Sequence, residues 1–353
     1  MNYNRLNDIL QLISDHTSFL ILIHDKPDGD ALGSGTALAL FLKKLGKESA
    51  VLSPCPFQKR LEFIKSPSVC YFEGYDAFEA SGFSYDFIVS VDVASDELIE
   101  TVSSRLPQSI DLAIDHHRVN TVTAAEKYVD AEASAAGEIL FSLFSMYAMI
   151  TNREIFDKEL CEALYASIAS DTGCFKYSNT TAATHDIAAK LMSIGIAAAE
   201  INRQLFDSRT RAQIAVERLA LSSLQFFYDG RLAIVVMDLE ELAAIGATDD
   251  DTDTISQLAR MIEGVQIGVL MREKKFEDGT RGYKFSVRSN GDTDISALCA
   301  VFGGGGHQKA AGCTIRADKK TALEKFAKEA KNYLVEISAN KRRRICIWHI
   351  LRR

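Results

Sequence analysis

Short apolar runs alternate with Ala- and Leu-rich or amphipathic stretches along the first part of the chain. We predict buried strands from the apolar runs at 19–23, 49–53, 86–93 and 110–114. We predict helices at 1–16, 31–45, 135–150 and 158–170, and further helices without strand signals at 182–194, 197–206 and 208–226. Strands that alternate with helices indicate an α/β fold with a doubly wound, mostly parallel sheet.

The pattern restarts after the turn signal Asp229-Gly230. Strands are predicted at 231–237, 265–272, 281–288 and 313–316, with helices at 238–245, 254–263, 294–302 and in the stretch that follows the last strand. This order predicts a second, smaller α/β domain. We therefore expect a first domain at 1–207, a helical connector at 208–229, a second domain at 230–340 and a basic tail at 341–353.

Composition narrows the classes of protein to consider. The chain has 353 residues, of which 47% are hydrophobic, and no apolar run approaches the ~20 residues of a membrane span. The N-terminus lacks a secretory leader and the seven cysteines form no CxxC pair, so we expect a cytoplasmic protein with reduced thiols. A formal charge of −8 argues against binding to long nucleic acid, which needs a broad basic face.

Polar residues recur where the predicted strands end. Because the carboxyl ends of parallel strands meet at one edge of a sheet, where ligands bind, we expect these side chains to converge. The residues are His24, Asp28, Asp30, Asp92, Asp115, His116 and His117, and Asp171 at a helix end. For the stretch 21–40 alone, the acidic residues also suit a turn followed by a helix cap.

Several carboxylates in one small space would repel one another unless metal ions were bound. Oxygen ligands mixed with imidazole, without thiolates, favour Mn²⁺ or Mg²⁺ over structural zinc. The candidates are too many for a single ion. Two ions ~3.5–4 Å apart that share a bridging carboxylate match the two-metal template of phosphoryl transfer.

These motifs, taken in order, resemble those of the DHH phosphoesterase family. The matching residues are His24-x-x-Pro27-Asp28-x-Asp30, then Asp92, then Asp115-His116-His117, then Ser170-Asp171-Thr172-Gly173. The run Gly303–His307, preceded by Arg288 and followed by Ala310-Ala311-Gly312, resembles the DHH-associated C-terminal domain. Length and two-domain organisation most resemble the bacterial nanoRNase/pAp phosphatase group.

The resemblance implies a role for each matching residue. One metal ion would be bound by His24, Asp28 and Asp92, and the other by Asp30, Asp92, His116 and Asp171, with Asp92 bridging. Asp115 would orient a ligand histidine from behind. His117 would face the substrate, either as a hydrogen-bond donor to the phosphate or as a general acid. The ions would most often be Mn²⁺, with Mg²⁺ or Co²⁺ as alternatives.

The second domain is expected to bind the substrate's phosphate or its terminal nucleotide. Arg288 offers a bidentate guanidinium, and Gly304, Gly305 and Gly306 expose backbone N–H groups that can surround a phosphate. His307 would contact a phosphate or a base. Lys309 lies close by in the sequence. The sequence does not decide whether Arg209 and Arg211 face the cleft or the solvent.

The resemblance implies a manganese-dependent phosphohydrolase. Its substrates would be short RNA oligonucleotides, 3′-phosphoadenosine 5′-phosphate (pAp) or linear dinucleotides, with no long nucleic acid and no membrane as partners. Two alternatives stay open: a polyphosphatase or pyrophosphatase on the same fold, and a non-catalytic nucleotide-binding regulator. The sequence does not rank the substrates, and it leaves a homodimer as an open alternative to a monomer.

Overall fold

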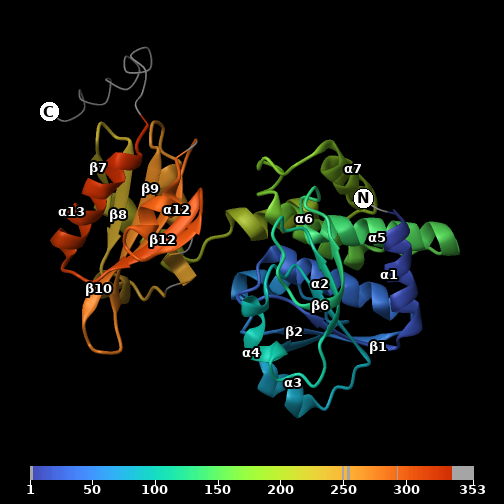
Figure 1. Cartoon of the computed structure of the whole chain (residues 1–353). Helices are drawn as coiled ribbons and strands as arrows, with labels where there is room; N and C mark the ends of the chain where they lie inside the picture. Colours follow the sequence, from blue (N-terminus) through green and yellow to red (C-terminus); the bar gives the residue numbers. More distant parts are fainter. Residues whose placement is uncertain (1–2, 249, 253–254, 292, 336–353) are drawn as a thin grey trace. The chain divides into compact units, whose positions relative to one another are not determined.

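The computed structural model describes residues 3–248, 250–252, 255–291 and 293–335 (Figure 1). The chain divides into two compact units, Met1–Ser208 and Arg209–Arg353. The basic tail expected at 341–353 lies outside the described residues. The division between them falls one residue beyond the expected end of the first domain, and each unit has its own hydrophobic core.

The first unit is built on a six-stranded sheet in which every pair of neighbours is parallel. In spatial order its strands are β3 (Cys70–Glu73), β2 (Glu48–Ser53), β1 (Ser18–Leu22), β4 (Phe87–Val91), β5 (Ile110–Asp115) and β6 (Ala124–Val129). This confirms the predicted doubly wound parallel sheet. The outermost strands β3 and β6 were not predicted, because their side chains are mostly half-buried or exposed and form no apolar run.

Helices cover both faces of this sheet (Figure 1). One face packs against α1 (Tyr3–Asp15), α2 (Gly29–Lys44), α5 (Ala136–Thr151) and α6 (Lys158–Asp171). The other face packs against α3 (Tyr75–Ser81) and α4 (Glu100–Ser103). The unit ends with α7 (Ala182–Ser193), α8 (Ala198–Asn202) and a π-helical turn at Arg203–Asp207. In the described part of the chain, no helix has the length and apolar character needed to cross a membrane.

Helices α2, α5 and α6 pack closely against one another near the carboxyl edge of the sheet. A Cβ atom on Gly33 of α2 would lie 2.8 Å from the carbonyl oxygen of Ala163 on α6. A Cβ atom on Gly137 of α5 would lie 2.0 Å from Oγ of Ser167, also on α6. Only glycine fits at these two positions, so α2, α5 and α6 approach more closely than side chains would permit.

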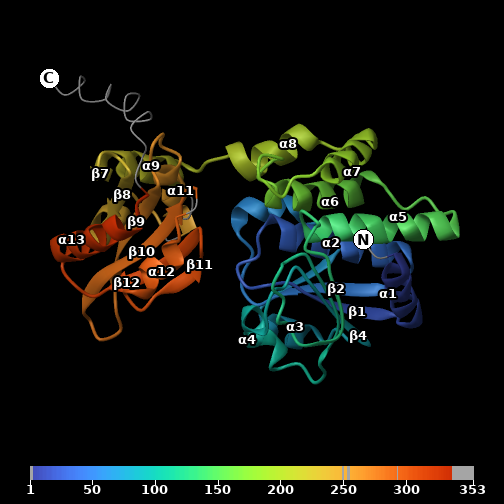
Figure 2. The same cartoon turned by 45° about the horizontal axis from the view of Figure 1, so that its top comes forward.

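The second unit contains a mixed six-stranded sheet. Its strands, in spatial order, are β11 (Gly305–His307), β12 (Ala310–Ile315), β10 (Arg281–Ser289), β9 (Ile267–Lys275), β8 (Leu232–Met237) and β7 (Gln225–Phe227). The pair β8–β9 is parallel and the others are antiparallel. Helices α12 (Ile295–Ala300) and α13 (Lys319–Ala330) pack on one face, and α9 (Arg211–Ser223), α10 (Leu239–Ala244) and α11 (Ile255–Arg260) pack on the other (Figure 2).

Two features of the second unit differ from the expectation. Helix α9, expected as part of a separate connector, buries Val216 and Ala220 in the core of the second unit. The glycine run, for which no strand was predicted, contributes β11, which pairs with β12. Glycine is depleted in strands, so composition alone gave no strand signal there.

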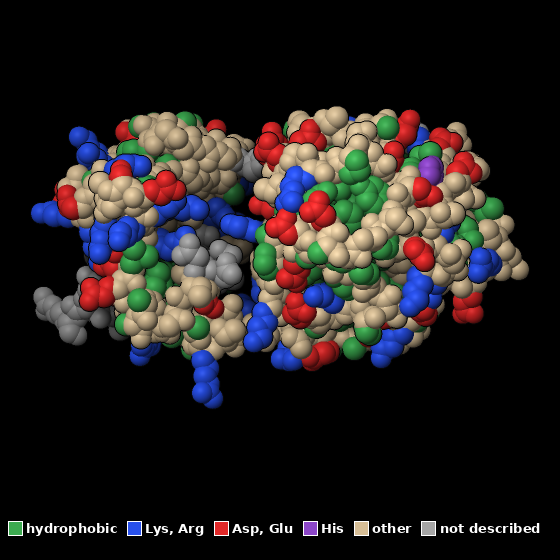
Figure 3. All heavy atoms as spheres, turned by 90° about the horizontal axis from the view of Figure 1, so that it is seen from below, with side chains coloured by type: hydrophobic (Ala, Val, Ile, Leu, Met, Phe, Trp, Pro, Cys, Tyr) green, Lys and Arg blue, Asp and Glu red, His purple; other side chains and the backbone are tan. Residues whose placement is uncertain are grey.

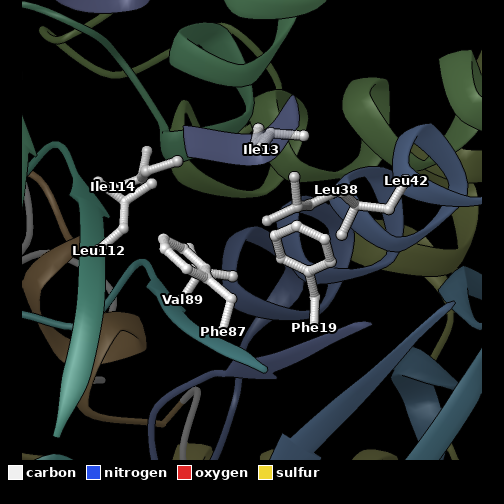
Figure 4. A pocket seen from close by; sticks show the side chains of 8 residues that line it. All are labelled: Ile13, Phe19, Leu38, Leu42, Phe87, Val89, Leu112 and Ile114. Carbon is white, nitrogen blue, oxygen red and sulfur yellow. The ribbon is translucent and has the colours of Figure 1, made fainter. Parts of the chain in front are cut away.

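A small cavity lies in the core of the first unit, beneath α1 (Figure 4). It measures about 10 Å³. Its walls are entirely apolar side chains from α1, α2 and strands β1, β4 and β5, namely Ile13, Phe19, Leu38, Leu42, Phe87, Val89, Leu112 and Ile114. It holds no polar group that could bind a ligand, so it belongs to the packing of the core and not to a functional site.

Candidate metal-binding site

The candidate site lies at the carboxyl edge of the parallel sheet. The chain leaves β1 toward β2 and β3 on one side, and toward β4, β5 and β6 on the other, so the topology switches between β1 and β4. His24 and Asp28 follow β1, and Asp92 follows β4. They therefore stand at the point where open α/β sheets bind their ligands.

One group of candidate ligands gathers around His24. Its Nε2 atom lies 3.9 Å from Oδ1 of Asp28 and 3.7 Å from Oδ2 of Asp92. The Nδ1–H of His24 donates to the carbonyl oxygen of Asp25 at 2.6 Å, which leaves Nε2 free to act as a ligand. Asp28 also caps α2, because its Oδ1 atom accepts from the backbone N–H groups of Asp30 and Ala31.

A second group gathers around His116. Its Nε2 atom lies 3.5 Å from Oδ2 of Asp30, 3.5 Å from Oδ1 of Asp92 and 3.4 Å from Oδ2 of Asp171. These ligands come from α2, from the end of β4, from the residue after β5 and from the last residue of α6. One imidazole thus faces three carboxylates, and the group has the composition of an oxygen-rich metal site.

Asp92 belongs to both groups. Its two carboxylate oxygens face different histidines, His24 and His116. The backbone of Asp92 is left-handed, with φ 58°, and its N–H donates to the carbonyl oxygen of Ile114 at 3.0 Å. The Oδ1 atom is buried and has no hydrogen-bond donor among the described residues. A buried carboxylate oxygen without a donor is costly, and a bound cation removes that cost.

Asp30 is fixed by backbone and side-chain donors. It is fully buried, and its Oδ2 atom accepts from the N–H of Ala136 at the start of α5, at 2.8 Å. Its Oδ1 atom accepts from the hydroxyl of Ser167. Ser167 was not among the predicted site residues, since a serine in a helix interior gives no distinctive signal. The only hint was its place one helical turn before Asp171.

Asp115 holds the exposed histidine of the site in place. Its Oδ1 atom accepts from Nδ1 of His117 at 2.7 Å and from the backbone N–H of His116 at 2.8 Å. Its Oδ2 atom accepts from the side-chain amide of Asn120 at 2.7 Å. Burial raises the pKa of Asp115, but the hydrogen bonds from His117 and Asn120 outweigh it, and the pKa lies below its ordinary value. Asp115 thus orients the ring of His117, whereas it contacts His116 through the backbone.

The charges of the cluster do not balance without cations. Burial, followed by repulsion from Asp30 and Asp28, raises the pKa of Asp92 well above its ordinary value. Burial and the charge of Asp30 raise the pKa of Asp171 to about 7. Burial also raises the pKa of Asp30. These carboxylates repel one another as they stand. The donor set and the unpaired Oδ1 atom of Asp92 therefore fit divalent metal ions.

The second unit contains the residues expected to bind substrate. Arg288 is half-buried on β10, and Gly305, Gly306 and His307 pair with β12. A Cβ atom on Gly304 would lie 2.1 Å from the carbonyl oxygen of Gly312, so this position requires glycine for packing. The side chain of Lys309 is exposed. Two arginines that the sequence left open also lie in this unit: Arg209 forms an ion pair with Glu217 at 3.4 Å, and Arg211 begins α9.

Two families match this chain, one for each unit. Residues 18–168 match the DHH family, N-terminal domain, and residues 231–336 match the DHHA1 domain. A bifunctional oligoribonuclease and PAP phosphatase NrnA from Thermus thermophilus is 29% identical over 315 residues, which cover 89% of each chain. The NrnA of Bacillus subtilis is 25% identical over 331 residues, which cover 91% of this chain and 98% of the relative.

A solved structure shows the same fold over both units. An exopolyphosphatase-related protein from Bacteroides fragilis superposes with a TM-score of 0.82 at 23% identity, over 94% of this chain and 97% of the other. This likeness concerns the fold, since identity at this level does not carry an activity with it.

Proposed function

Since this chain belongs to the DHH family of phosphoesterases and carries both a DHH and a DHHA1 domain, we propose that it is a divalent-metal-dependent hydrolase of small phosphorylated nucleotides. Its substrates are short RNA oligonucleotides, which it hydrolyses to mononucleotides, and pAp, from which it removes the 3′-phosphate. The named relatives that extend over most of this chain support these substrates. The observation that carries the proposal is the carboxylate of Asp92, which faces one histidine from each group of candidate ligands.

The residues that would hold the ions follow from the two groups. His24, Asp28 and Asp92 would bind one ion, and Asp30, Asp92, His116 and Asp171 the other. Mn²⁺ is the proposed metal, because imidazole and carboxylate ligands together suit it. Two divalent ions would lower the pKa of a bound water molecule and stabilise negative charge on the phosphate oxygens.

His117 and Asp115 are proposed to act on the phosphate side of the site. The hydrogen bond that His117 donates to Asp115 raises the pKa of His117 above its ordinary value, and 45% of the His117 side chain is exposed. A half-exposed, protonated imidazole can donate a hydrogen bond to a phosphate oxygen or a proton to a leaving group. In the second unit, Arg288 and the backbone of Gly304, Gly305, Gly306 and His307 are proposed to bind phosphate or the terminal nucleotide.

A panel of substrates tests this proposal. Protein saturated with Mn²⁺ is incubated with pAp, polyphosphate and a ladder of 5′-labelled RNAs from 2-mer to 24-mer at fixed salt. We expect kcat/KM to be highest between two and about five nucleotides and to fall steeply beyond, because a charge of −8 offers no long basic track. Rates that stay flat with length, early internal fragments, or activity on polyphosphate alone would each reject it.

A further inference from the structure

The mixed sheet of the second unit has one face that carries basic and small side chains. Alternate residues of β10 point to the same face, so Lys284, Ser286 and Arg288 lie together. The intervening residues Phe285 and Val287 are buried in the core beneath α12 and α13. Helices α9, α10 and α11 pack mainly over β8 and β9 on the basic face. Lys284 is exposed, and Ser286 and Arg288 are half-buried.

Arg260, at the end of α11, reaches this face beside Arg288. Arg288 pairs in register with Gly268 of β9, and residues directly opposite in an antiparallel pair share a face. A Cβ atom on Gly268 would lie only 2.4 Å from the backbone nitrogen of Arg260. The end of α11 therefore lies directly on the strand at the position next to Arg288. On its other side Arg288 pairs with Ala310, which has a small side chain.

No carboxylate among the described residues neutralises the two guanidinium groups. Among the residues that the structure describes, Arg288 donates to the carbonyl oxygen of Val287 at 3.0 Å, and neither Arg288 nor Arg260 has a carboxylate within ion-pair distance. Burial and the nearby charge of Arg260 lower the pKa of Arg288. Other arginines of this unit are paired, as Arg281 is with Glu273 at 2.9 Å and Arg316 with Asp278 at 2.8 Å. On the face shown in Figure 3, Lys and Arg side chains gather over this unit.

We propose that Arg260 and Arg288 together bind a phosphate monoester of the substrate, separate from the phosphate that is hydrolysed. A phosphate monoester carries nearly two negative charges near neutral pH, which matches two unpaired guanidiniums, whereas a diester carries one. This inference rests on the proposed function and narrows its substrates to nucleotides that bear a terminal phosphate. Such substrates include pAp and 5′-phosphorylated dinucleotides, in preference to dinucleotides with a 5′-hydroxyl.

Kinetic selectivity tests the proposal. The ratio of kcat/KM for a 5′-phosphorylated dinucleotide to kcat/KM for its 5′-hydroxyl analogue is measured for the wild type, Arg260→Gln and Arg260→Lys. We expect Arg260→Gln to lower this ratio about ten- to hundredfold and Arg260→Lys to restore part of it. Arg281→Gln, which removes a paired arginine on the opposite face, is the matched control and should leave the ratio unchanged. An unchanged ratio in Arg260→Gln overturns the inference and leaves the proposed function standing.

A binding measurement separates failure of the inference from failure of the proposed function. Binding of AMP and of adenosine to the full-length protein is measured by calorimetry in excess EDTA, so that no hydrolysis or metal is involved. We expect the wild type to prefer AMP, and Arg260→Gln to lose that preference while its circular dichroism spectrum stays native. If the wild type hydrolyses neither dinucleotide, the proposed function fails and this measurement alone decides the phosphate site. Equal binding of AMP and adenosine by the wild type overturns the proposed phosphate site.

Discussion

The Oδ1 atom of Asp92 lies 3.5 Å from Nε2 of His116, in a buried position where no described residue donates a hydrogen bond to it. Asp92 directly follows β4, and its own left-handed backbone turns this carboxylate into the space between two imidazoles. Asp92 is therefore the one carboxylate shared by the two groups of candidate ligands described above, and its removal should disturb both.

Replacement of Asp92 is expected to abolish turnover. In Asp92→Ala both candidate groups lose a ligand, so the protein should bind fewer metal ions and hydrolyse neither pAp nor dinucleotides. Metal content by mass spectrometry and initial rates measure the two effects. Asp86→Asn, which alters an exposed carboxylate that accepts hydrogen bonds from Thr17 and Ser18, is the control. It should keep its metal content and its activity. Near-normal activity of Asp92→Ala with two ions bound would contradict the shared role.

Asp115 and His117 are expected to act as one unit. Asp115→Asn weakens the hold on the His117 ring and should lower kcat about ten- to hundredfold with little loss of metal. His117→Gln should lower kcat similarly. The double variant tests the coupling, because removal of Asp115 should cost little once His117 is absent. Additive losses in the double variant would show that Asp115 acts on the site by another route.

Arg288→Ala is expected to weaken substrate binding while metal content stays intact. Loss of a charge-assisted contact to phosphate costs about 1.5–3 kcal/mol, which corresponds to a rise in KM of roughly ten- to hundredfold. Arg316→Ala, which breaks an ion pair with Asp278, serves as the control and should leave KM unchanged. If Arg288→Ala loses metal or unfolds, Arg288 has a structural role and the assignment of this face to substrate must be withdrawn.

Metal binding is expected to stabilise the protein more strongly at alkaline than at acidic pH. In the metal-free protein the folded pKa values of Asp92 and Asp171 lie above their unfolded values, that of Asp171 at about 7. The folded state therefore holds more protons, and its stability falls as pH rises from about 4 toward 7. Cations replace those protons, so the rise in Tm on adding Mn²⁺ to EDTA-treated protein should be larger at pH 8 than at pH 5.5.

A variant of Asp171 tests this linkage directly. Asp171→Asn cannot ionise at this position, so the metal-free variant should lose part of the fall in Tm between pH 5.5 and 7.5. Melting curves of the wild type and the variant, recorded in EDTA across that range, give the comparison. Parallel Tm profiles for the two proteins would show that the pKa of Asp171 is not raised in the folded state.

The sequence was sufficient to predict which side chains converge in the first unit. His24, Asp92 and His116 each follow a buried apolar strand, and parallel strands place their carboxyl ends at one edge. The donors that fix those ligands could not be predicted in the same way. Ser167 and the N–H of Ala136 reach Asp30 only because three helices pack closely at glycine positions, and that contact depends on tertiary structure.

The second unit was harder to read from the sequence. Arg288 was proposed from the sequence because it ends a predicted strand and precedes the glycine run at 303–306. Arg260 lies on a short helix at an unremarkable position, and its closeness to Arg288 depends on the absence of a side chain at Gly268. Strand β11 was missed because glycine carries no hydrophobic periodicity.

The dry cavity beneath α1 has a volumetric consequence. Its volume is about 10 Å³, and its wholly apolar walls offer a water molecule no hydrogen-bond partner, so it is empty in the folded state. Unfolding eliminates such space and makes the volume change of unfolding more negative. Hydrostatic pressure should therefore weaken the first unit, and Val89→Ile, which adds one methylene to the cavity wall, should make it less compressible and more resistant to pressure.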